Sequence, residues 1–265
     1  MSQNWVDELV EIMARLRSPG GCPWDREQTH SSLQEYLVEE SAELFDAVDE
    51  GDDAGMAEEL GDVLLQVVFH CQIAAEDARF DLQEVARRCC EKLRRRHPHV
   101  FGEAAVDDAA GVVRQWEAIK RQEKNPPASV SALHGVPRHL PALHRAHKMQ
   151  KKAARVGFDW PSVEGVLGKI EEELAEVKHA LADGQAQAAA EEIGDLLFAV
   201  VNLSRVQNRV AEDLLHDAVK KFEKRFMHME DSLRQDGRRL EECSLAELDV
   251  LWEQAKKAEK AANLA

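Results

Sequence analysis

Apolar positions recur every three or four residues along most of the chain. Two such series run over residues 33–48 and 60–68, and the turn-forming segment 50–53 lies between them. This spacing is the period of an amphipathic helix, and no stretch sustains the alternation that is typical of a strand. The pattern therefore predicts an all-α fold in which neighbouring helices form small antiparallel bundles.

One segment interrupts the helical pattern near the middle of the chain. Four of the eight prolines fall within residues 125–141. Proline disfavours helix at its own position and at the residue before it. The sequence therefore predicts two tandem helical-bundle modules, residues 1–124 and 142–265, joined by a Pro-rich linker over residues 125–141.

The two predicted modules carry the same acidic motif. In the first module EExxE occupies residues 39–43 and ExxD follows at 59–62, and in the second they occupy 172–176 and 192–195. Every acid of the second set lies 133 positions after its counterpart, and a similar apolar run follows each ExxD. A Trp-Glu-x-x-Lys block then closes each copy, at Trp116 and at Trp252. Ordered blocks of this kind indicate a duplicated helical module.

The spacing of the acids suggests a metal site. Acids three or four residues apart project from one face of a helix. If the two helices of each module pack antiparallel through their short turn, four or five carboxylates converge in one cleft. Crowded carboxylates either take up protons or bind cations. Oxygen ligands without a nearby imidazole favour Mg²⁺, with Mn²⁺ as a substitute, over a di-iron site with its Glu-x-x-His motif.

Simpler readings of the same residues stay open at this point. Acid pairs at helical spacing are common on solvated faces, so the chain can also be a helical interaction protein or a cation-binding bundle without catalysis. Gly61 and Gly194, inside the two ExxD motifs, serve either close helix packing or space for a ligand.

The amino-acid composition limits the kinds of partner that the chain is expected to bind and the cellular compartment in which it is expected to occur. Acids outnumber bases 50 to 34, and a net charge of -16 disfavours binding to nucleic acid or to anionic lipid. The five cysteines form no CxxC pair, which favours a reducing compartment. No apolar run approaches the ~20 residues of a membrane span, and the acidic N-terminus does not resemble a signal peptide. We therefore expect a cytoplasmic protein that binds neither nucleic acid nor membrane.

The ensemble of motifs resembles the MazG family of nucleoside triphosphate pyrophosphohydrolases, in its long two-module form. The acidic motif is accompanied by GCPWD at residues 21–25, RRHPHVF at 95–101, VGFDW at 156–160 and KFEKRF at 221–226. The similarity covers nearly the whole chain.

The resemblance implies an activity and a metal site. Members of the family are all-α, usually dimeric enzymes that cleave an NTP or dNTP between the α and β phosphates, which serves housecleaning or regulation of nucleotide pools. They need Mg²⁺, so this chain is expected to form a homodimer that binds Mg²⁺ and nucleotide. The resemblance assigns the metal to Glu173, Glu176, Glu192 and Asp195, with Glu40, Glu43, Glu59 and Asp62 as the first-module counterparts.

The resemblance also distinguishes the two modules. Lys169 matches the nucleotide-binding stretch of the active module, whereas Tyr36 stands at the corresponding position of the first module. We therefore predict that the second module is catalytic, with Glu172 orienting or deprotonating the attacking water. Lysine and arginine can neutralise phosphate and Trp252 can stack on a base, although the same residue types also serve solvated and core positions. The predicted nucleotide-binding residues are Lys169, Glu172, Glu173, Lys221, Arg225, Trp252 and Lys256.

Overall fold

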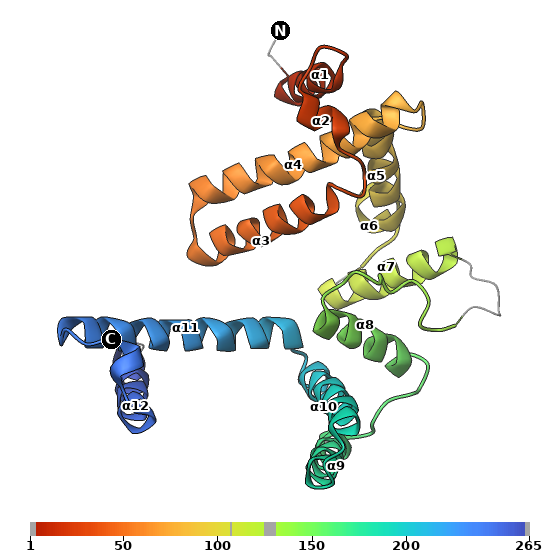
Figure 1. The fold of residues 1–265 in the computed structure, drawn as a ribbon. Helices are drawn as coiled ribbons and strands as arrows, with labels where there is room; N and C mark the ends of the chain where they lie inside the picture. The colour runs from red at the N-terminus through yellow and green to blue at the C-terminus, as the bar shows by residue number, and fades with distance from the viewer. Residues whose placement is uncertain (1–3, 107, 125–130, 263–265) are drawn as a thin grey trace. The chain divides into compact units, whose positions relative to one another are not determined.

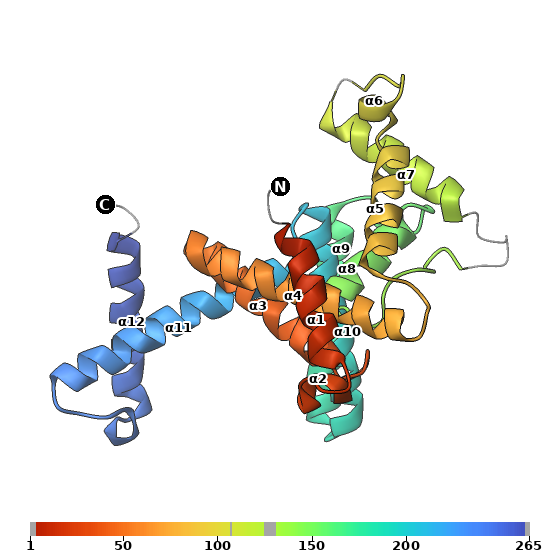
Figure 2. The same ribbon diagram turned by 90° about the horizontal axis from the view of Figure 1, so that it is seen from above.

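A computed structural model describes residues 4–106, 108–124 and 131–262 of the chain. Within these ranges every regular element is a helix, which confirms the predicted all-α fold (Figures 1 and 2). The chain divides into two compact units, Met1–Asn125 and Pro126–Ala265. Of the predicted linker, residues 125–130 lie outside the described part, and residues 131–141 form turns and bends without helix.

The first unit is built around a helical hairpin. Helices α3 and α4 pack against each other, α1 crosses α4, and α5 joins the other end of α4 to α6 and α7. The helices of this unit are α1 (Trp5–Arg17), α2 (Pro23–Glu27), α3 (Gln34–Glu50), α4 (Asp53–Glu76), α5 (Leu82–Arg96), α6 (Pro98–Phe101) and α7 (Ala109–Lys124).

A two-residue turn reverses the chain between α3 and α4. Gly51 ends α3 with a φ of 69°, in the left-handed region where side chains are strained and glycine is not. Asp52 then caps α4, because its side chain accepts a hydrogen bond from the backbone N–H of Ala54 at 3.1 Å. Such a short turn forces the two helices to run antiparallel. The acids of α3 and α4 are therefore held at the same level of the hairpin.

The core of the first unit lies where α1 and the start of α3 meet α4. Met13, Leu33, Val68, Phe69 and Ile73 are buried there together. Burial of this apolar surface is the main source of stability for the hairpin.

The second unit repeats the hairpin. Helices α9 and α10 pack closely, α8 lies against α10 and α11, and α12 packs on α11. The α9–α10 turn contains Gly184, which has a φ of 69° like Gly51. The elements of this unit are α8 (Ala142–Ala154), α9 (Val163–Ala182), α10 (Ala186–Val206), α11 (Ala211–Gln235), the 3₁₀ helix η1 (Leu240–Glu242) and α12 (Leu245–Ala262).

The hairpins leave large apolar side chains uncovered. In the first unit Val38 and Phe45 on α3 are exposed, and in the second Leu181 on α9 and Leu197 on α10 are exposed. Scattered exposed apolar residues are ordinary, but several on one hairpin mark a face that can be covered by another chain. No helix in the described part of the chain combines the length and the apolar character that crossing a bilayer would require.

Candidate metal and nucleotide site

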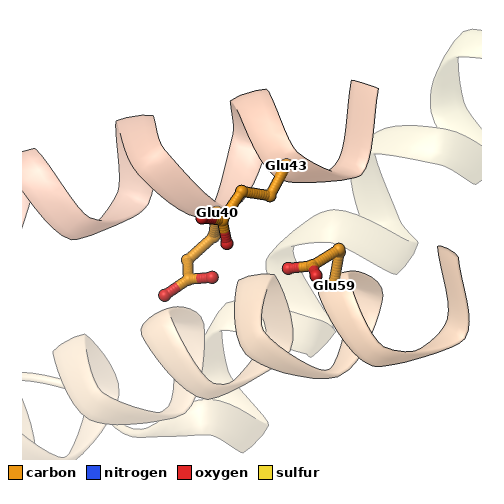
Figure 3. A group of neighbouring side chains, drawn as sticks. All are labelled: Glu40, Glu43 and Glu59. Carbon is orange, nitrogen blue, oxygen red and sulfur yellow. The ribbon is translucent and has the colours of Figure 1, made fainter. Parts of the chain in front are cut away.

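The first unit gathers three carboxylates between its two hairpin helices. Glu40 and Glu43 project from α3 toward Glu59 on α4 (Figure 3). One carboxylate oxygen from each lies within 4.8 Å of the others. Asp62 is close enough that its charge raises the pKa of Glu40. We call Glu40, Glu43 and Glu59 the first acid cluster.

The second unit forms a similar group from the corresponding motif. Carboxylate oxygens of Glu173 on α9 and of Glu192 and Asp195 on α10 lie within 4.8 Å of one another. Glu176, one turn along α9, is near enough to Glu192 to share a hydrogen bond with it. Glu173 is only 4% exposed, so this acid is held inside the hairpin and not on a solvated face. We call Glu173, Glu192 and Asp195 the second acid cluster.

The electrostatics of both clusters favour a cation. Burial, the charge of Glu176 with its hydrogen bond, and the charges of Glu173 and Asp195 raise the pKa of Glu192. Burial and neighbouring acids raise the pKa of Glu40 and of Glu59 in the same way. A divalent cation that prefers oxygen ligands would bind these carboxylates, and its positive charge would offset their repulsion.

Carboxylates elsewhere in the chain behave in the opposite way. Arginine partners lower the pKa of Glu84 and of Glu123 to about 2, and hydrogen bonds from Ser244 and Arg238 do the same for Glu247. These three acids, which lie on other helix faces, are therefore paired with donors or bases. The two acid clusters differ because most of their neighbours are other acids, which counts against their being simple solvated faces.

The raised pKa of Glu192 predicts how stability responds to pH when no metal is present. When the pKa of a carboxyl is higher in the folded chain than in the unfolded chain, the group stabilises the fold at pH values below the unfolded pKa. This stabilisation is lost as the pH rises through the folded pKa. In EDTA, we expect Glu192→Gln to melt at a higher temperature than the original chain at pH 8, and the difference to shrink toward pH 5. Thermal unfolding followed by circular dichroism measures it. A variant that is no more stable at pH 8 would contradict the account of a repulsive cluster.

Lys169 forms ion pairs with two acids of α9, one of which belongs to the second acid cluster. Its ammonium lies 2.6 Å from a Glu173 oxygen and 2.9 Å from a Glu172 oxygen. Hydrogen bonds to these two carboxylates raise the pKa of Lys169 and keep it charged. Glu172 is exposed beside Lys169 and is not one of the three clustered acids. The structure thus places a fixed positive charge at the edge of the second acid cluster.

The first unit has no counterpart of this lysine. Tyr36 stands at the corresponding position, packs against the core and meets Trp24 edge-on with ring centroids 5.8 Å apart. An aromatic ring in a core cannot neutralise a phosphate. The two units therefore share the acids but differ in the charge beside them.

Space is left beside the acids on one helix of each hairpin. A methyl group built on Gly61 or on Gly194 would meet no atom within 4 Å outside the local backbone of its own helix. Close packing by another helix of the same unit therefore does not explain these glycines. The open space at these two exposed glycines is compatible with the alternative, in which they leave room for a ligand.

Four predicted nucleotide-binding residues lie in a separate group on α11 and α12, which we call the α11–α12 group. Arg225 forms an ion pair with Glu259 at 2.7 Å, and its guanidinium lies over the Trp252 ring at 5.6 Å. Figures 1 and 2 both show α12 beside α11 and away from α9 and α10. The structure thus brings the acids and Lys169 together and leaves these residues apart. The group consists of Lys221, Arg225, Trp252 and Lys256.

The first unit repeats the arrangement of this group. Arg96 on α5 pairs with Glu123 on α7 at 2.6 Å, just as Arg225 on α11 pairs with Glu259 on α12. Glu123 lies seven residues after Trp116, and Glu259 lies seven residues after Trp252. The duplicated blocks of the sequence therefore form corresponding contacts in both units, which indicates that they have at least a structural role.

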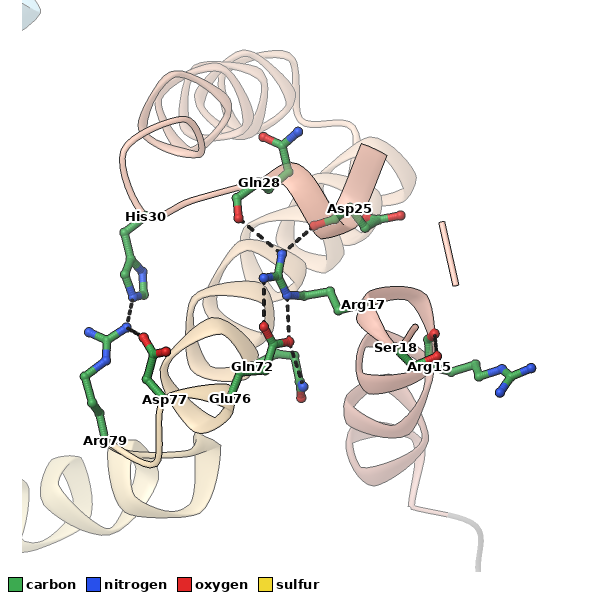
Figure 4. A network of polar contacts seen from close by, with 10 residues as sticks. All are labelled: Arg15, Arg17, Ser18, Asp25, Gln28, His30, Gln72, Glu76, Asp77 and Arg79. Atoms are coloured by element: carbon green, nitrogen blue, oxygen red, sulfur yellow. Dashed lines mark hydrogen bonds and ion pairs between the residues drawn. The ribbon is translucent and has the colours of Figure 1, made fainter. Parts of the chain in front are cut away.

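A partly buried arginine anchors the segment before the hairpin in each unit. In the first unit Arg17 forms two 2.8 Å hydrogen bonds to the carboxylate of Glu76 and binds the backbone carbonyls of Asp25 and Gln28 (Figure 4). In the second unit Arg205 holds Asp159 through both carboxylate oxygens. These bidentate pairs fix the approach of the preceding segment to the hairpin.

A pocket of about 640 Å³ adjoins the second acid cluster, and analysis of the sequence did not predict it. Its walls come from α8, from the segment before α9, and from the facing sides of α9 and α10. The only sequence signal was the aromatic segment 156–160, which the family resemblance marked without assigning a role. The lining includes Gln150, Phe158, Trp160, Lys169, Glu173, Asp195, Phe198, Asn202 and Arg205.

Comparison with known proteins identifies the family. A sequence profile of the MazG nucleotide pyrophosphohydrolase domain matches this chain twice, at residues 28–101 and 162–229. The chain belongs to the MazG family. Each matched range contains one complete acidic motif, whereas Trp252 and most of the pocket segments before α9 lie outside both ranges.

Two relatives in this family match over nearly their whole length. The nucleoside triphosphate pyrophosphohydrolase/pyrophosphatase MazG of Thermotoga maritima is 51% identical over 250 residues, which cover 94% of this chain and 95% of that protein. A nucleoside triphosphate pyrophosphohydrolase of Escherichia coli K12 is 42% identical, with 97% and 98% coverage. Among solved structures, a mazG-related protein from Thermotoga maritima is 30% identical and covers 43% of this chain and 98% of its own, with a TM-score of 0.38.

Proposed function

We propose that this MazG-family protein, a nucleoside triphosphate pyrophosphohydrolase, cleaves its substrates between the α and β phosphates with Mg²⁺ held by the second acid cluster. The observation that supports this proposal most strongly is that carboxylate oxygens of Glu173, Glu192 and Asp195 lie within 4.8 Å of one another, with Lys169 beside them. The products are then a nucleoside monophosphate and pyrophosphate. Mn²⁺ is the expected substitute, because it shares the preference for oxygen ligands.

The residues of the second unit fit this chemistry without a covalent nucleophile. Magnesium bound at the cluster would neutralise the triphosphate and acidify a bound water. Glu173, Glu176, Glu192 and Asp195 are the residues that would hold the ion. Lys169 supplies a positive charge at the edge of the site.

Proton transfer is assigned to the remaining acid of the motif. Glu172 lies outside the cluster, so its carboxylate is not occupied in holding the ion. Its ion pair with Lys169 keeps it in place beside Glu173, its neighbour in the sequence. An ionised carboxylate in this position can orient the attacking water and accept its proton.

Other parts of the proposal concern the assembly and the first unit. The exposed apolar side chains on both hairpins support a homodimer in which a second copy covers them. The first acid cluster lacks the lysine, so we assign the first unit a weaker or architectural role. Hydrolysis of this kind removes triphosphates from the nucleotide pool, which supports a housecleaning or regulatory role.

Product analysis tests the proposed cleavage. Incubation with ATP, GTP, CTP and UTP in Mg²⁺, followed by anion-exchange chromatography, is expected to yield monophosphate and pyrophosphate. Diphosphate with orthophosphate would contradict the cleavage position. Absence of turnover with any ribo- or deoxyribonucleotide would instead favour a helical interaction protein or a cation-binding bundle.

A further inference from the structure

Two histidines of the first unit meet edge to edge beside the start of α3. His30 lies in the segment 28–33 between α2 and α3, which we call the pre-α3 segment, and His70 lies on α4. Their Nδ1 atoms are 2.8 Å apart, their ring planes form an angle of 9°, and the ring centroids are 5.1 Å apart. Because the nitrogens are much closer together than the centroids, the two rings lie side by side in nearly one plane. This is the geometry of a hydrogen bond between imidazoles, in which an N–H points along a lone pair.

Arg79 determines which ring nitrogens carry protons. Its guanidinium, which is also paired with Asp77 at 3.1 Å, lies 2.8 Å from His30 Nε2 (Figure 4). A guanidinium can only donate, so this nitrogen accepts, and the single proton of a neutral His30 is on Nδ1. His30 Nδ1 therefore donates to His70 Nδ1, and the proton of His70 is on Nε2. The contact requires both rings to be neutral, each in one defined tautomer.

The other titratable groups around the pair keep their charge in the range where histidines titrate. Arg17 on α1 binds the carboxylate of Glu76 on α4, which lowers the pKa of Glu76, and donates to the backbone carbonyl of Gln28 in the pre-α3 segment. Burial raises the pKa of the Cys71 thiol, so the neighbour of His70 on α4 stays neutral. Arginine and carboxylate groups ordinarily titrate far from neutral pH, whereas an imidazole titrates at about 6.5.

Protonation disrupts this contact from either side. A proton on His70 Nδ1 would face the N–H of His30, and a proton on His30 Nε2 would face the guanidinium of Arg79. Burial of the ring, together with the charge of His30, lowers the pKa of His70. A histidine whose pKa is lower in the folded chain stabilises the fold at pH values above its unfolded pKa of about 6.5, and this stabilisation is lost as the pH falls through the folded pKa. The contact is therefore intact at neutral pH and weakened in mild acid.

We propose that His30 and His70 form a pH-dependent latch, which holds the pre-α3 segment on α4 while both rings are neutral and releases it when either ring is protonated. Leu33, at the end of the segment, is 1% exposed in the core of the first unit, and α3 begins at the next residue. Release of the segment loosens the start of the helix that carries Glu40 and Glu43. The proposal does not depend on the proposed function, because it concerns the folding of the first unit alone.

The second unit has no need of such a latch. The 133-residue offset places Val163 and Leu203 at the positions of His30 and His70. Helix α9 already begins at Val163, whereas α3 begins only at Gln34, four positions later in the repeat. A regular helical turn thus occupies the place of the pre-α3 segment in the second unit. In the first unit the segment is irregular, and side-chain contacts hold it instead.

Hydrogen exchange measures release of the segment, since the backbone N–H groups of Thr29, Ser32 and Leu33 are hydrogen-bonded within it. Mass spectrometry of the full chain in Mg²⁺ at pH 7.5 and pH 5.5, corrected for the intrinsic exchange rate at each pH, gives a protection factor for each peptide. Protection over residues 28–33 is expected to fall by about 10-fold or more at pH 5.5, because protonation replaces a hydrogen bond by two opposed donors. Protection over residues 68–74, in the buried part of α4, is expected to stay the same. Unchanged protection over residues 28–33, or an equal fall over residues 68–74, would overturn the proposal.

A double variant removes the titration and keeps a hydrogen-bonding pair. In His30→Asn combined with His70→Asn, the side-chain amides retain a donor and an acceptor in place of the two imidazoles, and neither amide titrates. Protection over residues 28–33 is then expected to be the same at both pH values. His228→Asn is the matched control, because His228 is exposed on α11 of the second unit, and it should keep the pH response of the original chain. A double variant that responds to pH as the original chain does would contradict the latch.

Nuclear magnetic resonance of the unmodified chain decides the case in which the double variant leaves the segment unprotected at both pH values. Long-range proton–nitrogen spectra at pH 7.5 are expected to show a proton on Nδ1 of His30 and on Nε2 of His70. Both rings should become protonated over the same pH range in which protection of residues 28–33 is lost. The opposite tautomer in either ring, or protonation outside that range, would overturn the proposal.

Discussion

Replacing Glu173 by glutamine, or Asp195 by asparagine, is expected to lower kcat/KM for NTP hydrolysis about 10³-fold, because a bound metal supplies several kcal/mol of transition-state stabilisation and each ~1.4 kcal/mol is a factor of ten. Each change removes one charged ligand from a group of oxygens that lie within 4.8 Å of one another. The fold should persist, since neutralising an acid relieves repulsion and Lys169 keeps its ion pair with Glu172. Steady-state kinetics and far-ultraviolet circular dichroism measure the two properties.

The duplicated chain supplies the matched control for these variants. Glu40 occupies in the first unit the position that Glu173 occupies in the second. Glu40→Gln is expected to cost much less activity, because Tyr36 leaves the first unit without the lysine that lies beside the second acid cluster. Complete loss in Glu40→Gln would reverse the assignment of the active unit, and wild-type turnover in both second-unit variants would remove the second acid cluster from the mechanism.

Removal of divalent cations is expected to stop turnover altogether. Without a cation, a substrate with about four negative charges would approach a cluster in which burial and the repulsion of neighbouring carboxylates already raise the pKa of Glu192. Added Mg²⁺ should restore activity and raise the melting temperature with its concentration, as any ligand of the folded state does. Titration after treatment with EDTA, followed by pyrophosphate release and by thermal unfolding, measures both effects.

Asp195→Asn provides the control for the metal experiment. Its melting temperature should respond less to Mg²⁺ than that of the original chain, because one ligand of the second acid cluster has lost its charge. Undiminished hydrolysis in excess EDTA would contradict the metal-dependent mechanism. An equal thermal response in both proteins would show that the stabilising Mg²⁺ binds elsewhere.

The parts of the fold that could be predicted are those determined by the spacing of residues that are close together in the sequence. The helical period and the Gly51-Asp52 turn determine that α3 and α4 form an antiparallel hairpin, and the 133-residue offset extends the argument to α9 and α10. Acids at i and i+3 on both helices of such a hairpin can face the same gap, and in both units three of them do. The all-α fold and the gathering of acids therefore follow from residues that are close in sequence.

The pocket beside the second acid cluster was not predictable in this way, because its walls are far apart in sequence. Gln150 comes from α8 and bonds a backbone carbonyl of α10, and the segment of Asp159 is fixed by Arg205, 46 positions later. No spacing rule indicates which way such amides point. The position of the α11–α12 group apart from the acids likewise depends on how α12 packs along α11.

The most direct measurement is an anomalous difference map from crystals soaked with Mn²⁺ and a non-hydrolysable α,β-methylene triphosphate. The account predicts a manganese peak between α9 and α10, coordinated by oxygens of Glu173, Glu192 and Asp195, with the analogue's phosphates beside it. A map in which those carboxylates hold no metal while the nucleotide is bound at another place would contradict it.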